Sequence, residues 1–165
     1  MITIASMGID PGGTTGLALV VCEKRATLKE SLATATGLSA IEVMGDWQHQ
    51  AEAIGGMMVQ FRDKSYLEGR SSMICIENFV LRRRQEGGAT GNLTSIWVAA
   101  GAWGYYRAKR ADGDGHEPEV AFPMPSQAKS FATDERLKMW GCYVTGAHKR
   151  DAMRHAILGV NELLG

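Results

Sequence analysis

The pattern of hydrophobic and polar residues predicts a β-hairpin at the start of the chain. Ile2–Ile9 and Leu17–Cys22 are two short apolar runs, and Pro11–Gly16 between them has the composition of a turn. Two such runs joined by a glycine-rich turn are typical of antiparallel strands. Ala40–Met44 predicts a third strand, which would close an antiparallel meander.

The middle of the chain combines a helical pattern with a buried strand. From about Asp46 onward, apolar residues recur at helical spacing and would share one face; these are Ile54, Met57, Met58 and Phe61. Ser72–Glu77 follows as a nearly unbroken apolar run, as expected of a strand buried on both faces. Residues 23–38 follow neither pattern, and no element is predicted there.

The second half of the chain begins with a helix that is apolar nearly all round. Asn92 or Thr94 can cap this helix, which runs to about Lys109 and is predicted to be buried or to form a partner surface. The remaining predicted elements are a short strand, two short helices and a final helix, at Glu119–Phe122, Ser126–Phe131, Asp134–Trp140 and His148–Leu164. An antiparallel meander followed by βαβ units predicts an α/β fold, in which a mixed five-stranded sheet carries helices on both faces.

Length and composition narrow the class of protein. The chain has 165 residues, 45% of them hydrophobic and 22% charged, and no repeat or linker divides it, so we expect a single domain over residues 1–165. No run approaches the ~20 apolar residues of a membrane span, and the N-terminus lacks the pattern of a signal peptide. Three scattered cysteines argue against a disulfide framework or a zinc site and suit a reducing cytoplasm.

Charge is balanced overall but unevenly distributed. The net charge is zero, yet residues 1–77 carry 6 Lys and Arg against 9 Asp and Glu, whereas residues 78–165 carry 12 against 9. The basic excess is concentrated at Arg82, Arg83 and Arg84. Because local basic patches, rather than total charge, decide phosphate binding, this distribution permits DNA binding without requiring it.

Acidic residues lie at the ends of two predicted strands and at the start of the last helix. Asp10 closes the first strand, Glu77 closes the buried strand, and Asp151 lies in the first turn of the final helix, three residues after His148. Positions i and i+3 of a helix share a face, so His148 and Asp151 can point to one site. If the fold brings the acids together, their repulsion favours Mg²⁺ or Mn²⁺. Two such ions about 4 Å apart can activate water against a phosphodiester.

Each of these residues also has an ordinary structural interpretation. Asp10 before Pro-Gly-Gly can be a turn residue, and Glu77 can be a surface carboxylate at a strand end. Asp151 can simply interact with the helix dipole, and His148 can be a capping or core histidine. Their combination in chain order is what favours an active site.

Three segments of the chain resemble the motifs of the RuvC Holliday-junction resolvases. Gly8–Gly16 (GIDPGGTTG) is similar to the family's G-[IL]-D-P-G-x-x-x-T/S-G opening, with one residue fewer before the last glycine. Ile74–Glu77 resembles the second motif, a strand that ends in the catalytic glutamate, and His148–Ala152 resembles the [DH]-x-x-D-A motif that opens the final helix. Pro125–Lys129 falls where the family has a P-x-x-x-K segment. The chain looks like a divergent, phage-encoded member.

This resemblance implies an RNase H-like fold, a homodimer and a bacterial or phage-infected cytoplasm. It also implies that two Mg²⁺ or Mn²⁺ ions support hydrolysis of branched DNA to a 5′-phosphate and a 3′-hydroxyl. Asp10 would bridge the ions, Glu77 would lie on one side and Asp151 would complete the set. His148 stands where many relatives have a fourth carboxylate, and would be a ligand or a base.

The resemblance also suggests contacts to DNA and to a second copy. Phe79 is a candidate for wedging into the junction, with core packing as the alternative. Arg82, Arg83 and Arg84 lie in a glycine-rich loop that we expect either to track phosphates or to be a solvated surface. Lys129 is a candidate for holding the scissile phosphate. The helix Asn92–Lys109 is a candidate dimer contact or part of the core, because it carries four aromatic residues, Trp97, Trp103, Tyr105 and Tyr106.

Other functions remain open on sequence alone. Nucleases acting on RNA–DNA hybrids or flaps share strand-end acids. Actin-like ATPases and sugar kinases begin with a D-x-G-x-T-x-G loop similar to Gly8–Gly16, but they need two lobes, and no second phosphate motif is present. That interpretation would also leave Glu77 and Asp151 without a role. A non-catalytic DNA-binding relative is a further alternative.

Overall fold

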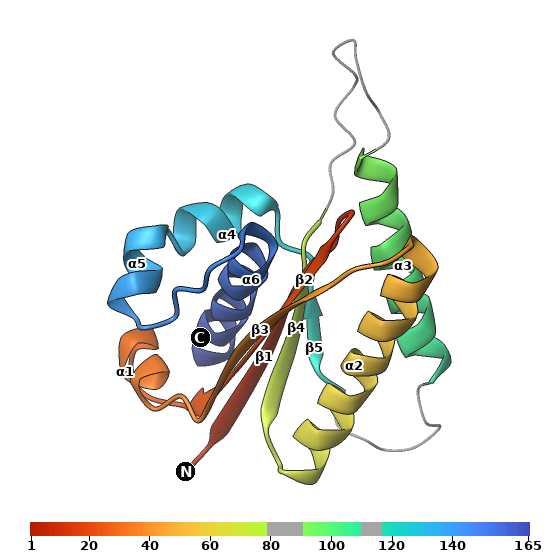
Figure 1. Cartoon of the computed structure of the whole chain (residues 1–165). Coiled ribbons are helices and arrows are strands. Elements are labelled where there is room, and N and C mark those ends of the chain that lie inside the picture. Colours follow the sequence, from red (N-terminus) through yellow and green to blue (C-terminus); the bar gives the residue numbers. More distant parts are fainter. Residues whose placement is uncertain (79–90, 110–116) are drawn as a thin grey trace.

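A computed structural model of the chain describes residues 1–78, 91–109 and 117–165 (Figure 1). Its centre is a five-stranded sheet in the order β3-β2-β1-β4-β5. The strands are β1 (Thr3–Asp10), β2 (Thr15–Glu23), β3 (Gly37–Val43), β4 (Ser71–Ile76) and β5 (Glu119–Ala121). The first three strands form an antiparallel meander, while β4 pairs parallel to β1 and β5 pairs parallel to β4. The predicted α/β fold with a mixed five-stranded sheet is confirmed.

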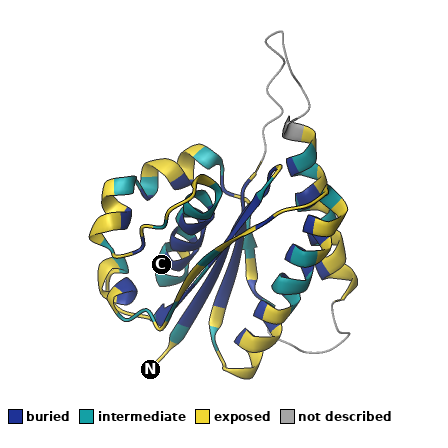
Figure 2. Ribbon diagram, in the orientation of Figure 1, coloured by how far each residue is buried: buried dark blue, intermediate teal, exposed yellow. Residues whose placement is uncertain are grey.

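Helices cover both faces of this sheet (Figure 1). One face carries α2 (Trp47–Leu67) and α3 (Gly91–Ala108). The other face carries α6 (Ala147–Leu164), with three short helices beside it: α1 (Leu28–Ala33), α4 (Pro125–Phe131) and α5 (Asp134–Met139). The three central strands, β2, β1 and β4, are almost entirely buried (Figure 2).

Side-chain alternation along the strands divides the interior into two cores. In β1, Ala5, Met7 and Ile9 pack toward α2 and α3, whereas Ile4 packs toward α6. The residues of β4 after Ser71 are all buried, as expected of a central strand covered on both faces. The sheet is therefore rigid where it carries the ends of β1 and β4.

The predicted elements agree with the structure except between residues 23 and 38. That segment contains α1, which begins after the N-cap Thr27. The Thr27 hydroxyl accepts a hydrogen bond from the Glu30 amide at 3.2 Å, and the Glu30 carboxylate accepts one from the Thr27 amide at 3.1 Å. Six residues are too few to establish a helical period, so the capping pair was the signal available.

Close contact between α6 and the sheet depends on glycine. A Cβ atom on Gly8 would lie 2.0 Å from the Ala152 carbonyl oxygen and 2.4 Å from the Ala156 nitrogen. A Cβ atom on Gly159 would lie 2.2 Å from the Ser6 hydroxyl oxygen. These distances are well below van der Waals contact, so α6 can lie at this depth only because the side chains are absent.

The helix α3 has a buried face and an exposed face. Val98, Ala102 and Tyr106 are buried, and α3 packs against α2 so closely that a Cβ atom on Gly101 would lie 2.8 Å from that of Ala51. Core packing therefore accounts for one face of the helix. Large side chains of α3 also remain exposed, namely Leu93, Trp97 and Tyr105. The dimer contact through α3 stays a prediction.

The three cysteines of the chain form no disulfide. Cys22, Cys75 and Cys142 are buried free thiols, and burial raises the pKa of Cys75 to about 12. Among the described residues, no helix has both the length and the apolar character needed to cross a membrane.

Candidate active site

The parallel pairing of β1 and β4 brings Asp10 and Glu77 to the same edge of the sheet. Ile9 pairs with Ile76, and the Glu77 amide donates a hydrogen bond to the Ile9 carbonyl at 2.9 Å. Asp10 and Glu77 therefore end adjacent strands, and only 7% and 8% of their surfaces are exposed. The alternative that Glu77 is a surface carboxylate is wrong.

The first turns of α6 complete this cluster. His148 Nδ1 lies 3.1 Å from Asp10 Oδ2, which joins residues at opposite ends of the chain. The side chain of His148 is 44% exposed, so it is not a core histidine. A Cβ atom on Gly16 would lie 2.0 Å from the His148 carbonyl oxygen, so the start of α6 rests directly on the β1–β2 hairpin.

The carboxyl group of Asp10 has a strongly shifted pKa. Its pKa is raised to about 6, first by burial and then by the negative charges of Glu77 and Asp151, against the opposing hydrogen bond from His148. A carboxylate that is buried among like charges carries an energetic penalty that a cation would relieve. Glu77 and Asp151 are thus near enough to act electrostatically on Asp10, and a shared metal site stays a prediction.

Asp151 differs from the other two acids in its partners. It pairs with Arg154 on its own helix, and its Oδ2 lies 3.0 Å from Lys129 Nζ on α4. Arg154 also pairs with Asp134 and donates from Nε to the Ala132 carbonyl at 3.0 Å. Two cations therefore border the acidic cluster and neutralise its outer member.

The donor set suits a hard divalent cation. Carboxylate oxygens from Asp10, Glu77 and Asp151, with the imidazole of His148, are ligands that Mg²⁺ and Mn²⁺ accept. No three His, Cys, Asp or Glu side chains of the described residues converge closely enough to hold a metal in the present arrangement. A metal would have to draw Asp151 away from Lys129 and Arg154, and the unrelieved charge at Asp10 favours that exchange.

His155 on α6 was not among the residues that sequence reasoning selected. Its Nε2 lies 2.9 Å from Glu77 Oε2, and the residue is 1% exposed. The available signal was helical spacing, since His155 lies seven residues after His148 and four after Asp151, on the same face. Sequence alone does not show which strand this face would meet.

Gln50 on α2 was also missed, and it holds the loop that follows Asp10. Its Nε2 donates to the carbonyls of Gly13 and Gly45, both at 2.9 Å, and its Oε1 accepts from the Thr15 hydroxyl at 2.5 Å. Gln50 is fully buried. One side chain thus connects α2 to the β1–β2 turn at Gly13 and to the start of β2 at Thr15.

We expect Gln50→Ala to destabilise the fold by about 2–4 kcal/mol, because buried partners lose their hydrogen bonds and a cavity remains. Gln48→Ala, at an exposed position of the same helix, is the matched control and should change stability by less than about 0.5 kcal/mol. Urea unfolding of both variants provides the measurement. Equal stability of the two would show that the Gln50 contacts contribute nothing.

The predicted DNA contacts are only partly within the structure. Lys129 lies beside Asp151 with its side chain 52% exposed, and its contact with DNA stays a prediction. Phe79, Arg82, Arg83 and Arg84 lie outside the described residues.

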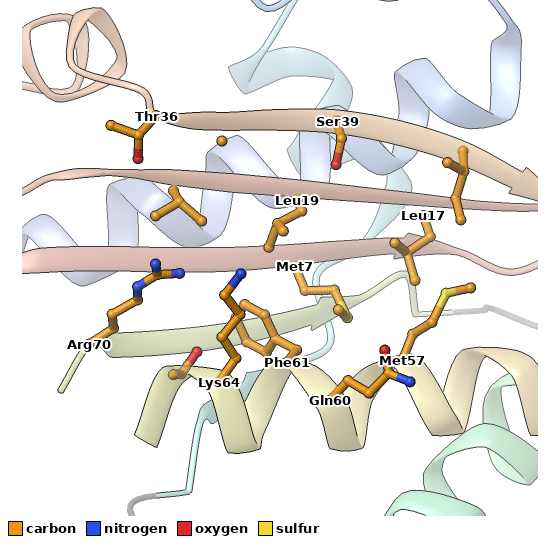
Figure 3. Close-up of a pocket in the computed structure, with 14 residues that line it drawn as sticks. Met7, Leu17, Leu19, Thr36, Ser39, Met57, Gln60, Phe61, Lys64 and Arg70 are labelled. Carbon is orange, nitrogen blue, oxygen red and sulfur yellow. The ribbon is translucent and has the colours of Figure 1, made fainter. Parts of the chain in front are cut away.

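A separate groove lies between α2 and the outer strands of the sheet (Figure 3). It has a volume of about 360 Å³, an apolar floor that includes Leu19 and Phe61, and the cationic side chains Lys64 and Arg70 at its margin. None of the predicted metal ligands lines this groove. The acidic cluster is instead a shallow site at the strand ends.

The fold is similar to that of a solved protein–DNA complex. The solved structure of T. thermophilus RuvC in complex with Holliday junction substrate matches it with a TM-score of 0.59, over 93% of this chain and 90% of that chain, at 18% sequence identity. This likeness establishes a RuvC-like, RNase H-like fold. No family model matches the chain, and no curated protein sequence is significantly similar to it.

Proposed function

We propose that this chain is a metal-dependent endonuclease that cuts branched DNA, with four-way junctions as its principal substrate. The observation that carries the proposal is that Asp10 and Glu77 end adjacent strands of a RuvC-like sheet, where His148 at the start of α6 lies 3.1 Å from Asp10. Free buried thiols are compatible with action in the cytoplasm of a bacterial or phage-infected cell.

The acids have separate roles in this proposal. Asp10 would be the principal ligand of Mg²⁺ or Mn²⁺, since the charges of both other acids act on it, and Glu77 and Asp151 would be further ligands. The chemistry supplied by such bound ions is activation of water and stabilisation of the leaving oxygen. His148 is partly exposed and bonded to Asp10, so it can serve as a further ligand or take the proton of the attacking water. The P–O3′ bond breaks, leaving a 5′-phosphate and a 3′-hydroxyl.

Lys129 and Arg154 would exchange partners when substrate binds. In the present arrangement both cations pair with Asp151. If Asp151 bound a metal, Lys129 and Arg154 would lose their carboxylate partner. The negatively charged scissile phosphate could then take its place. Lys129 is the more exposed of the two and is the one we assign to contact DNA.

A homodimer through α3 forms part of the proposal, because two nicks on a four-way junction require two sites. Support comes from the exposed side chains of Leu93, Trp97 and Tyr105 on that helix. Sedimentation at micromolar concentration should give the mass of a dimer. A monomer under those conditions would reject this part of the proposal.

The function can be tested with four labelled substrates: a four-way junction, a flap, a linear duplex and an RNA–DNA hybrid. Each is incubated with Mg²⁺, Mn²⁺ or EDTA, beside an Asp10→Asn control. We expect paired nicks on the junction that require metal and are absent with the control. Junction binding without cutting would favour a non-catalytic relative, and preferential cutting of flap or hybrid would change the assigned substrate.

A further inference from the structure

A second histidine of α6 contacts the acidic cluster from below. His155 is 1% exposed, and its Nε2 lies 2.9 Å from Oε2 of Glu77. The hydrogen bond joins residues 78 positions apart and connects α6 to the end of β4. Burial of an imidazole and a carboxylate costs free energy of desolvation, which the hydrogen bond between His155 and Glu77 offsets.

The depth of α6 makes this contact possible. Gly8 and Gly159 allow the helix backbone to approach β1, as their clashes with an added Cβ show. His148, Asp151 and His155 share one face of α6. The first two lie beside Asp10 at the open end of the sheet, and His155 lies one turn deeper, under Glu77.

The two ring nitrogens of His155 have different surroundings. Nε2 faces Glu77, whereas the buried Nδ1 has no hydrogen-bond partner among the described residues. A neutral imidazole with its proton on Nε2 fits these surroundings, because it donates to the carboxylate and leaves no unsatisfied N–H group. The Oε1 atom of Glu77 has no such bond within the described parts of the chain.

We propose that His155 is a positioning residue for Glu77, whose Nε2–H holds Oε2 and thereby presents Oε1 to a divalent cation. The inference rests on the proposed function only in that it takes Glu77 as a metal ligand. Groups that hold ligating carboxylates in this way typically contribute 10–100-fold, roughly, to metal affinity or activity. His155 itself would touch neither metal nor DNA.

A purely structural role makes a different prediction. If the His155–Glu77 pair only fastens α6 to β4, its loss would lower stability without changing metal affinity in the protein that remains folded. A positioning role instead predicts weaker metal binding at unchanged fold. The nature of the replacement also matters, because the amide nitrogen of glutamine can take the place of Nε2, whereas that of the shorter asparagine takes the place of Nδ1.

The experiment compares His155→Gln, His155→Asn and His155→Leu in the full chain, with Mn²⁺ affinity measured by calorimetry. We expect the Asn and Leu variants to bind Mn²⁺ about 10–100-fold more weakly and to lower kcat on a four-way junction with KM unchanged. The Gln variant should retain most of the wild-type Mn²⁺ affinity and most of the wild-type kcat. His49→Leu, at an exposed histidine of α2, is the matched control and should bind Mn²⁺ as the wild type does.

A second comparison places His155→Leu in a Glu77→Gln background. If His155 acts through Glu77, the added substitution should weaken Mn²⁺ binding no further. Equal weakening in both backgrounds would overturn the inference, as would folded Asn and Leu variants that bind Mn²⁺ within twofold of wild type. If those variants fail to fold, NMR spectra of the wild type provide the test. We expect the chemical shift of the His155 imidazole proton to change on addition of Mg²⁺, and an unchanged shift would overturn the inference.

These outcomes separate the inference from the proposed function. If the wild type binds Mn²⁺ in a His155-dependent way but cuts none of the nucleic-acid substrates, the proposed nuclease function is wrong and the positioning role of His155 is supported. If the wild type cuts the junction and the His155 variants behave like it, the nuclease function is supported and the positioning role is wrong. Absence of saturable Mn²⁺ binding to the wild type would overturn both.

Discussion

Asp10→Asn is expected to lower junction cleavage by at least ~10³-fold while leaving the fold intact, since losing the central carboxylate removes several kcal/mol of transition-state stabilisation. Asparagine has the same shape as aspartate, so the amide oxygen of the variant could still accept a hydrogen bond from His148. Single-turnover cleavage in Mg²⁺ and in Mn²⁺ gives the size of the loss. Residual activity above about a tenth of wild type would remove Asp10 from the mechanism.

The same substitution should stabilise the protein when no metal is present. The folded pKa of Asp10 is about 6, above the value of 3.8 expected of an isolated Asp, so the folded state binds this proton more tightly than the unfolded state. Ionised Asp10 therefore opposes folding, and its penalty develops as pH rises from about 4 to about 6, reaching roughly 1–3 kcal/mol at neutral pH. The neutral amide of the Asp10→Asn variant removes that penalty.

Thermal unfolding in EDTA between pH 4 and pH 8 tests whether Asp10→Asn is more stable than the wild type without metal. We expect the difference in stability between Asp10→Asn and wild type to grow with pH and to level off above about pH 7. Addition of Mg²⁺ should stabilise the wild type more than the variant, because only the wild type offers the full set of carboxylates. A variant that is less stable than wild type at neutral pH in EDTA would contradict the electrostatic account.

Gly8→Ala is expected to destabilise the fold by about 3 kcal/mol or more. Overpacking usually costs about 1–3 kcal/mol, but here the added methyl group meets backbone atoms of Ala152 and Ala156, which cannot rotate away. The helix α6 must then move from β1. Displacements of about 1 Å can cost roughly 10²-fold in activity, so cleavage should also fall, since His148 and Asp151 move with the helix.

Gly13→Ala provides the control for this prediction. Gly13 lies in the turn after β1, and a Cβ atom there would meet nothing within 4 Å. The free energy of unfolding of the Gly13→Ala variant should stay within about 0.5 kcal/mol of the wild-type value. Urea unfolding of both variants measures the difference. If Gly8→Ala proved as stable as Gly13→Ala, α6 would not depend on the close approach at Gly8.

Sequence determined the features of this protein that depend on local pattern. Apolar runs bounded by turn residues identified β1, β2 and β4, and helical spacing identified α2, because burial of one face imposes a period on the chain. Asp10, Glu77 and Asp151 could be selected for a similar reason. Each lies at the end of a recognisable element, next to a short motif that can be read without knowing the fold.

Only the tertiary structure decided which side chains meet across these elements. The bonds from His155 to Glu77 and from Thr15 to Gln50 join residues 78 and 35 positions apart, and they depend on the depth and rotation of a helix against the sheet. That depth is set by contacts at Gly8 and Gly159 with residues on other elements. A local period specifies which face of a helix is buried, but the partner of each buried polar atom follows from packing in three dimensions.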